Sequence, residues 1–378
     1  MCVFLERQVA GLEIKRKNRK KIYELLYDQD GLTKQEIATA LRLSLPTVTQ
    51  YLKDLMEAGL IIQSGSVGYT GGRNAAAYSI VNDHRVAIGL DITRYHIYAA
   101  VVDLRGQIIH LDTVKIPFRR TPEYMCALAQ TVKALIEHAG VREEQILGVS
   151  MGVPGIISVD GNEIEYGSTA ALTGLHRAEA SESIPFPTMF CRDADAACLA
   201  EMFGTECMDN AFYLLLSNSV SGSFYQKDQI FRGNTMRAAR IEHICLDPNG
   251  RECYCGQKGC VDAYCNSTRL SFLANGVLRD MFAMVENRDE KAIERWEEYR
   301  FYLAKTINAI RMLYDCQVIL GGYVGRHLDP YLEELKALTQ QMDPYHENPS
   351  YIRTARVWKE AVAVGAALHY IVDFLNRI

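Results

Sequence analysis

The chain has 378 residues, 48% of them hydrophobic, which is enough for two or three domains with proper cores. It has no run of 18 apolar residues and no signal peptide, so we expect neither a membrane span nor export, and its 11 cysteines then indicate a reducing cytoplasm. Residues 1–80 hold 11 Lys and Arg against 8 Asp and Glu, while the remainder hold 30 against 38, so a basic head on an acidic body suggests that the head meets a polyanion.

The first 60 residues predict three helices. Residues 17–27 have the period of an amphipathic helix. Thr33 is a good N-cap for a second helix, and Glu36 completes a capping box. Ser44 is suited to cap a third helix whose first turn holds Pro46. The side chains expected to face inward from the second and third helices are Ile37, Ala38, Leu41, Val48, Leu52 and Leu55.

This spacing is that of a helix-turn-helix, whose second helix presents polar side chains to the DNA major groove. Residues 65–72 predict a flexible turn, and residues 77–80 a strand beyond it, so a hairpin wing follows. A small helical domain for protein contact is the alternative, but motif, wing and charge together favour double-stranded DNA. The residues expected to contact DNA are Thr47, Thr49, Gln50, Lys53 and Arg73.

After Asn82 the pattern becomes that of an α/β domain, with buried strands alternating with helices. A strand at 86–91 ends in Asp91, and a second strand runs into the Gly/Pro loop 152–155. A helix follows Asp193. Further expected elements are strands at 95–103, 107–111 and 318–322 and a small-residue helix at 361–368.

Three cysteines within eight residues, Cys253, Cys255 and Cys260, follow His243 by ten positions or more. Three thiolates and one imidazole make the closed tetrahedral shell that structural Zn²⁺ prefers. A disulfide cluster and buried free thiols are the alternatives, but a disulfide needs an oxidising compartment. The spacing therefore predicts one structural zinc ion with four protein ligands.

These motifs together resemble the ROK family, which contains bacterial sugar kinases and sugar-responsive transcriptional repressors. The cysteine run is similar to the family signature Cys-x-Cys-Gly-x-x-Gly-Cys-x-Glu, and Gly71-Gly72-Arg73 is similar to the wing of the repressor branch. The resemblance covers essentially the whole chain. It implies a winged helix-turn-helix at 1–80, a two-lobed actin-like, ribonuclease-H-like α/β body at 85–378 with a zinc loop at 243–260, and a homodimer or dimer of dimers.

The same resemblance predicts that kinase activity is lost. The family's kinases carry two glycine-rich phosphate loops, whereas the first loop here is Ile92-Thr93-Arg94-Tyr95-His96 and the second, 217–223, keeps one glycine. Bulky side chains obstruct a phosphate from approaching the backbone, so we expect no useful ATP binding. Asp193 stands where the kinases keep a general base. In a regulator it can accept a hydrogen bond from a sugar, cap a helix, or do both.

The expected effector pocket departs from the kinase pattern. Arg192 replaces an Asn, Arg240 stands where a Glu is expected, Asp262 replaces the last Glu, and His243 is retained. Two arginines raise the local charge by about 3, which favours an anionic effector such as a sugar phosphate or acidic sugar. Alternatively, the arginines pair with nearby carboxylates and the pocket has lost sugar binding. The predicted effector-binding residues are Arg192, Asp193, Arg240, His243 and Asp262.

The sequence therefore predicts a transcriptional regulator, with repression as the expected effect, that binds operator DNA and responds to a sugar or sugar phosphate. An active ATP-dependent sugar kinase fused to a DNA-binding head is the second hypothesis, and the phosphate-loop sequences count against it. A protein-interaction scaffold is the third.

Overall fold

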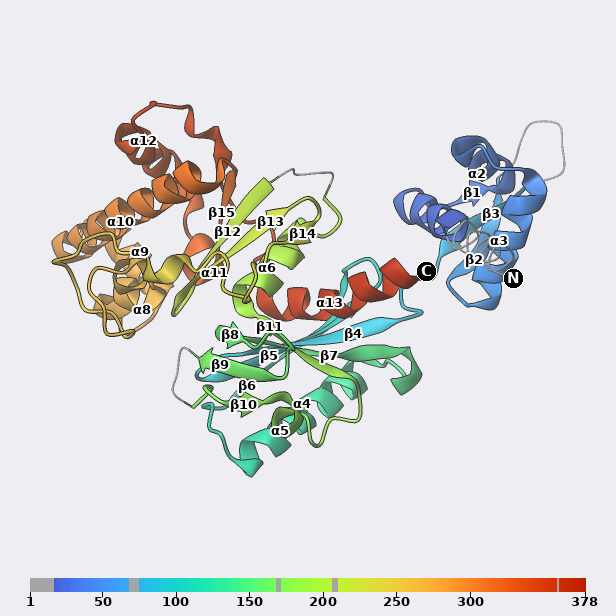
Figure 1. Cartoon of the computed structure of the whole chain (residues 1–378), viewed down its shortest axis with the longest axis horizontal. Helices are drawn as coiled ribbons and strands as arrows, with labels where there is room; N and C mark the ends of the chain where they lie inside the picture. The colour runs from blue at the N-terminus through green and yellow to red at the C-terminus, as the bar shows by residue number, and fades with distance from the viewer. Residues whose placement is uncertain (1–16, 68–74, 168–170, 206–209, 359) are drawn as a thin grey trace, which may run out of the picture.

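The computed structural model describes residues 17–67, 75–167, 171–205, 210–358 and 360–378, and it consists of a small N-terminal head and a two-lobed α/β body (Figure 1). None of the helices in these ranges has the length and apolar character needed to cross a membrane.

The head contains the three expected helices and a small antiparallel sheet. The first helix covers residues 17–28, and the strands pair in the order β1-β3-β2. Its core is a cluster that includes Ile22, Leu26 and Leu52. The later elements of the head are β1 (Leu32–Thr33), α2 (Lys34–Leu41), α3 (Leu45–Glu57), β2 (Ile61–Val67) and β3 (Ala75–Ile80).

The predicted helix caps are confirmed. The Thr33 hydroxyl accepts a hydrogen bond from the Glu36 backbone N–H at 3.3 Å, and the Glu36 carboxylate accepts one from the Thr33 N–H at 2.7 Å. The Ser44 hydroxyl accepts from the Thr47 N–H at 3.3 Å. These bonds satisfy amides that a helix start leaves without partners, so both boundaries follow from local sequence.

The hairpin beyond α3 is longer than expected. Gly65, which we predicted to begin the turn, lies within β2, where the pairing with β3 shifts register. The bulge lets the strand continue to Val67. The wing residue Arg73 lies outside the described residues.

The first lobe of the body is built on a sheet with the strand order β11-β7-β4-β5-β6. The strand expected at 107–111 extends further, to Lys115. A second, small sheet has the order β10-β9-β8. The elements are β4 (Val86–Ile92), β5 (His96–Asp103), β6 (Ile108–Lys115), α4 (Pro122–Ala139), η1 (Glu143–Gln145), β7 (Ile146–Val153), β8 (Gly155–Ile157), β9 (Glu163–Gly167), β10 (Leu175–His176), α5 (Arg177–Ala180), β11 (Thr188–Arg192) and α6 (Asp193–Met202).

The second lobe is built on a sheet with the order β14-β13-β12-β15-β16, and a group of helices packs on one face of it. Residues of α6 pack on the opposite face. The elements are β12 (Asn210–Leu216), β13 (Val220–Gln226), β14 (Gln229–Ile230), η2 (Ile241–His243), α7 (Val261–Cys265), α8 (Ser267–Leu270), η3 (Ser271–Ala274), α9 (Leu278–Glu286), α10 (Glu290–Tyr314), β15 (Gln317–Gly321), α11 (Gly322–Gly325), η4 (Asp329–Tyr331), α12 (Leu332–Met342), η5 (Pro349–Tyr351), β16 (Ile352–Thr354) and α13 (Ala361–Arg377).

Helix α13 runs from the junction of the two lobes to the head (Figure 1). At one end it touches its neighbours backbone to backbone. A Cβ on Gly365 would stand 1.6 Å from the Ala196 carbonyl oxygen of α6, and one on Gly89 would stand 1.8 Å from the Ala363 carbonyl oxygen. At the other end, Ile378 belongs to the buried core of the head. Residues of α13 also share a buried cluster with β12 and β15 of the second lobe, so this helix connects both lobes with the head.

Polar contacts join the head to the body beside the end of α13. The Arg105 guanidinium donates to the Tyr27 carbonyl oxygen at 2.7 Å and forms an ion pair with Asp30 at 2.6 Å. The Tyr27 hydroxyl donates to the Leu104 carbonyl oxygen at 3.0 Å. The β5–β6 turn of the first lobe is thus attached directly to the first helix of the head.

Candidate functional site

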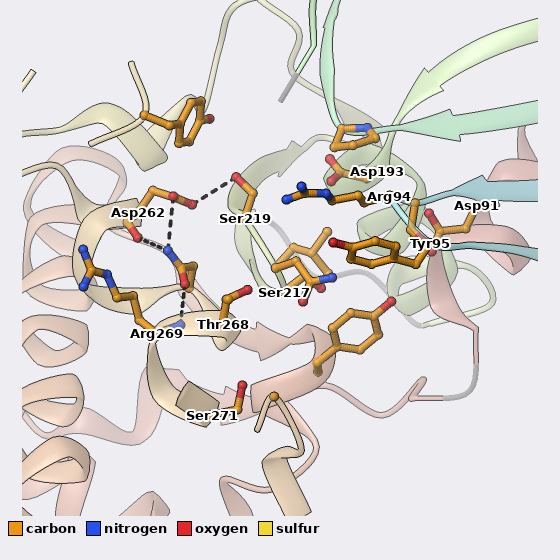
Figure 2. Close-up of a pocket in the computed structure, with 18 of the residues that line it drawn as sticks. Asp91, Arg94, Tyr95, Asp193, Ser217, Ser219, Asp262, Thr268, Arg269 and Ser271 are labelled. Atoms are coloured by element: carbon orange, nitrogen blue, oxygen red, sulfur yellow. Dashed lines mark hydrogen bonds between the residues drawn. The ribbon is translucent and has the colours of Figure 1, made fainter. Parts of the chain in front are cut away.

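A cavity of about 830 Å³ is lined by residues of both lobes. This is the size of pocket that holds a small organic ligand. Figure 2 shows Asp91, Arg94, Tyr95 and Asp193 on one side and Asp262 and Arg269 on the other. Because each lobe supplies one wall, a ligand in this cavity would contact both lobes.

Asp193 stands at the first residue of α6, with Arg192 as the N-cap, so the expected capping position is off by one residue. One of its carboxylate oxygens accepts a hydrogen bond from the Ala194 N–H at 2.7 Å. Burial raises the pKa of Asp193 to about 6. Desolvation, together with the neighbouring Asp193 charge, raises the pKa of Asp91 well above its usual range. The cavity thus holds one carboxyl with a pKa of about 6 and a second whose neutral form is favoured by burial.

The two arginines predicted to bind an effector point elsewhere, and neither lines the cavity. Arg192 is buried, lies 3.7 Å from Asp195, and donates to the carbonyl oxygens of Ala238 and Gly222. Arg240 forms an ion pair with Glu242 at 2.7 Å. These are internal ion pairs of the kind that the alternative interpretation predicted, because a buried guanidinium needs a nearby carboxylate or carbonyl.

Asp262 does line the cavity, but one carboxylate oxygen is already bonded within the protein. It accepts from the Val220 backbone N–H at 2.6 Å and from the Ser219 hydroxyl at 3.0 Å (Figure 2). The neighbouring Ser267 N–H donates to the Ser217 carbonyl oxygen at 2.7 Å. The start of α7 and α8 therefore holds the 217–220 loop in place, and an acid stands where a phosphate loop would present its amide to an anion.

The turn between β4 and β5 supplies side chains that we did not predict to bind a ligand. Thr93 and His96 close the turn through a backbone bond of 3.0 Å. Arg94 and Tyr95 at its tip line the cavity, and the Arg94 side chain points into it (Figure 2). The sequence pattern marks these residues only as replacements for the glycines of a phosphate loop. Their place at the end of a buried strand beside Asp91 was the signal that could have identified them.

The four predicted metal ligands come together. Their ligand atoms, from His243, Cys253, Cys255 and Cys260, all lie within 4.8 Å of one another. The Cys255 and Cys260 sulfurs are 3.7 Å apart, and Cys253 Sγ lies 3.7 Å from His243 Nδ1. A tetrahedron with metal–sulfur bonds of about 2.3 Å has edges of roughly 3.7 Å. Two of the six edges thus have the tetrahedral length, and the four side chains fit a four-coordinate metal ion.

Tyr254 links this cluster to the cavity. His243 Nε2 lies 3.3 Å from the Tyr254 hydroxyl, and the Tyr254 side chain lines the cavity. His243 itself is predicted to bind effector but does not line the cavity, because its Nδ1 faces the sulfurs and its Nε2 faces Tyr254. Directly after Cys260, α7 begins and carries Asp262. A metal ion would therefore hold a tyrosine and an acid of the cavity wall in position.

The predicted DNA-contacting residues in the described part of the head lie on α3. The side chains of Thr49, Gln50 and Lys53 are exposed, whereas Thr47 is partly buried and its hydroxyl lies 2.7 Å from that of Ser44. Gln50 donates to Asp54 at 2.8 Å, and Lys53 lies 3.6 Å from Glu57. Both contacts are on the surface and weak enough to exchange for contacts to DNA.

Comparisons with known proteins cover both parts of the chain. Residues 87–371 match the model of the ROK family, and residues 15–62 match that of the winged helix-turn-helix DNA-binding family. The chain is 22% identical over 385 residues to the DNA-binding transcriptional dual regulator NagC of Escherichia coli K12, covering 96% of this chain and 94% of that protein. It is 27% identical over 298 residues to N-acetylmannosamine kinase of Salmonella typhi, covering 74% of this chain and 97% of that protein.

Solved structures show the same division. A ROK family transcriptional regulator, described as a homologue of the E. coli MLC protein, superimposes with a TM-score of 0.77 at 16% identity, over 96% of this chain and 97% of that chain. The ROK hexokinase from Thermus thermophilus superimposes with a TM-score of 0.62 at 25% identity, over 77% of this chain and 99% of that chain. Nearly the whole chain is thus matched in the first case and only about three quarters in the second.

Replacing Cys255 with serine tests the metal cluster, because it removes one of four ligands. We expect the bound metal to be lost, the free energy of unfolding to fall by more than about 2 kcal/mol, and the response to any cavity ligand to weaken with it. Elemental analysis and thermal unfolding are the measurements. Cys126→Ser, at an exposed cysteine outside the cluster, is the control and should change neither. One metal ion per chain and an unchanged ligand response in Cys255→Ser would refute the role.

Proposed function

The chain belongs to the ROK family, and from this premise we propose that it is a transcriptional repressor that binds operator DNA through its head and is switched by a sugar in the cavity between its lobes. Zinc is the metal that the three thiolates and one imidazole favour, and with four protein ligands its role is structural rather than catalytic.

The observation that carries this proposal is the extent of the match. The transcriptional regulator NagC matches the chain through head and body, over 96% of its length, whereas N-acetylmannosamine kinase matches 74%. The kinase comparison leaves a share of the chain about the size of the winged helix-turn-helix head unmatched. A chain that retains this head and has the surface of α3 exposed is equipped to recognise DNA.

DNA recognition by this head implies a second copy. One helix-turn-helix contacts one half-site, so specific binding normally requires a dimer on a palindromic operator. We therefore propose a homodimer or a dimer of dimers.

The sugar is proposed to bind beside Asp193, whose ionised carboxylate would accept a hydrogen bond from a sugar hydroxyl. Binding would reach the head through α13. Val362 in its first turn lines the cavity, and at its far end the Ile378 carbonyl oxygen accepts a bond from Arg19 of the head at 3.0 Å. Coupling of this kind requires that the sugar bind one arrangement of the lobes more tightly than another.

A sugar kinase with a DNA-binding head remains the second candidate, because Asp193 keeps its place at the cavity with a pKa of about 6. The phosphate loops do not support it. Asp262 accepts the Val220 N–H, so this amide is already occupied where a phosphate would need it. At the first loop, the side chains of Ile92, Thr93 and Arg94 line the cavity where a nucleotide phosphate would need direct access to the backbone amides.

Substitutions on α3 test the DNA proposal. Lys53→Ala should weaken binding about equally for all sequences and lower the slope of log affinity against log salt by about 1, because it removes one phosphate contact. Gln50→Ala should cost about 1–3 kcal/mol on the preferred operator only. Electrophoretic shifts or fluorescence anisotropy at several salt concentrations measure both.

The matched control is Lys291→Ala, at an exposed lysine of α10 in the body. It carries the same charge change and should leave DNA affinity and its salt dependence unaltered. Equal losses in Lys53→Ala and Lys291→Ala would mean that net charge, rather than the α3 surface, binds the DNA.

The pKa of Asp193 gives sugar binding a pH dependence. The folded-state pKa, about 6, lies above the ordinary aspartate value of 3.8, so the carboxyl gains a proton as pH falls through 6 and ceases to be an ionised acceptor. We expect affinity to fall about tenfold between pH 7.5 and pH 5. Titration calorimetry measures this, and Asp193→Asn should bind weakly at both values. Tighter binding at pH 5 in the native chain would contradict the role.

The lost kinase activity is tested by titration with MgATP. We expect no heat of binding up to millimolar nucleotide and no ADP when hexoses are added, because both phosphate loops are blocked by side chains. Micromolar ATP affinity, or phosphorylation of any hexose, would instead support the second candidate.

A further inference from the structure

The cavity contains an arginine whose position is not accounted for by an ion pair or by helix packing within the protein. Arg94 is exposed at the tip of the β4–β5 turn and lines the cavity. Among the residues that the structure describes, its side chain forms no hydrogen bond or ion pair, and its guanidinium lies 5.2 Å from the centre of the Tyr95 ring. Arg192 and Arg240, by contrast, each have a carboxylate partner within 4 Å. Arg94 is therefore available to a ligand in a way that they are not.

Hydrogen bonds hold the backbone at Arg94 in place. Its carbonyl oxygen accepts from the Phe118 N–H at 2.9 Å, and the next carbonyl, of Tyr95, accepts from the Ile116 N–H at 3.0 Å. A backbone held at two successive residues needs little ordering when a ligand binds, so only side-chain entropy is lost. Figure 2 shows the guanidinium pointing into the cavity, on the side of Asp193 and Ser219.

The other charges of the cavity leave Arg94 uncompensated. Burial raises the pKa of Asp91 and so favours its neutral form, and Asp262 is bonded to Val220 and Ser219. Asp193 is the remaining carboxylate of the cavity lining among the described residues, and no bond joins it to Arg94. A positive group without a partner in a concave site attracts an anion, and a guanidinium fork matches the geometry of a phosphate or carboxylate.

We propose that Arg94 determines the specificity of the cavity for an anionic sugar: the hydroxyls of the sugar bind beside Asp193 while its phosphate or carboxylate binds the Arg94 guanidinium. This rests on the proposed function, which names a sugar effector, and it adds the chemical class of that sugar. It also moves the anion contact from Arg192 and Arg240 to a residue on a different element. Arg269, which also lines the cavity, belongs to the opposite wall and points away from Arg94 (Figure 2).

Titration calorimetry on the full chain tests the assignment. The ligands are glucose, N-acetylglucosamine and N-acetylmannosamine, the 6-phosphate of each, glucuronic acid, and inorganic phosphate as the anion without a sugar. We expect at least one anionic sugar to bind about tenfold to a hundredfold more tightly than its neutral parent, the usual effect of a charge-assisted hydrogen bond. Arg94→Gln should remove this preference and leave the affinity of the neutral sugar unchanged. Arg269→Gln is the matched control and should keep the preference.

The inference is overturned if neutral sugars bind as tightly as anionic ones, if no sugar in the panel binds, or if Arg94→Gln keeps the preference. Inorganic phosphate binding as tightly as the sugar phosphates would also count against it, because the sugar would then contribute nothing. A chain that binds operator DNA and releases it with a neutral sugar would refute this inference alone. A chain that binds no DNA would refute the proposed function, whatever the calorimetry shows.

Discussion

The structure depends on the contact of α13 with the backbones of its neighbours. Gly365 against the Ala196 carbonyl and Gly89 against Ala363 leave no room for even a methyl group, so α13, α6 and β4 sit at the closest distance that main chains allow. Interiors packed this tightly transmit displacement rather than absorb it. Asp91 lies two residues beyond Gly89, and Asp193 opens α6, so the same contact places both carboxyls at the cavity. The far end of α13 lies in the core of the head.

The electrostatics of the cavity follow from which of its groups are bonded within the protein. Asp262 accepts a hydrogen bond from the backbone of the 217–220 loop. Arg192 and Arg240 each form an ion pair with a carboxylate of the protein itself. These groups set the shape of the walls and are not available to a ligand. Asp193 and Arg94 are the charged groups at which we propose that a ligand binds, although one Asp193 oxygen also accepts the Ala194 N–H. Asp262 in turn accepts the Val220 amide, which a phosphate loop would leave free for a nucleotide.

The predicted metal cluster lies beside the part of the cavity wall that the second lobe supplies. His243 uses one nitrogen toward the sulfurs and the other toward Tyr254, while Cys260 leads directly into the helix that bears Asp262. Tyr254 and Asp262 both belong to the cavity wall. A metal ion in the cluster would therefore stiffen the wall opposite Arg94 without contacting a ligand itself.

The sequence by itself determined the features whose partners lie close together along the chain: the helix caps at Thr33 and Ser44, the alternation of strands and helices, and the ligand spacing from Cys253 to Cys260. In each case a short segment supplies both halves of the interaction. Only the tertiary structure decided that Arg192 and Arg240 are internally paired and that Arg94 faces the cavity. Those outcomes depend on where the folded chain places β13, the residues before η2 and the β4–β5 turn. Residue type predicted a positive charge at the site, but which arginines line the cavity depends on the packing of distant elements.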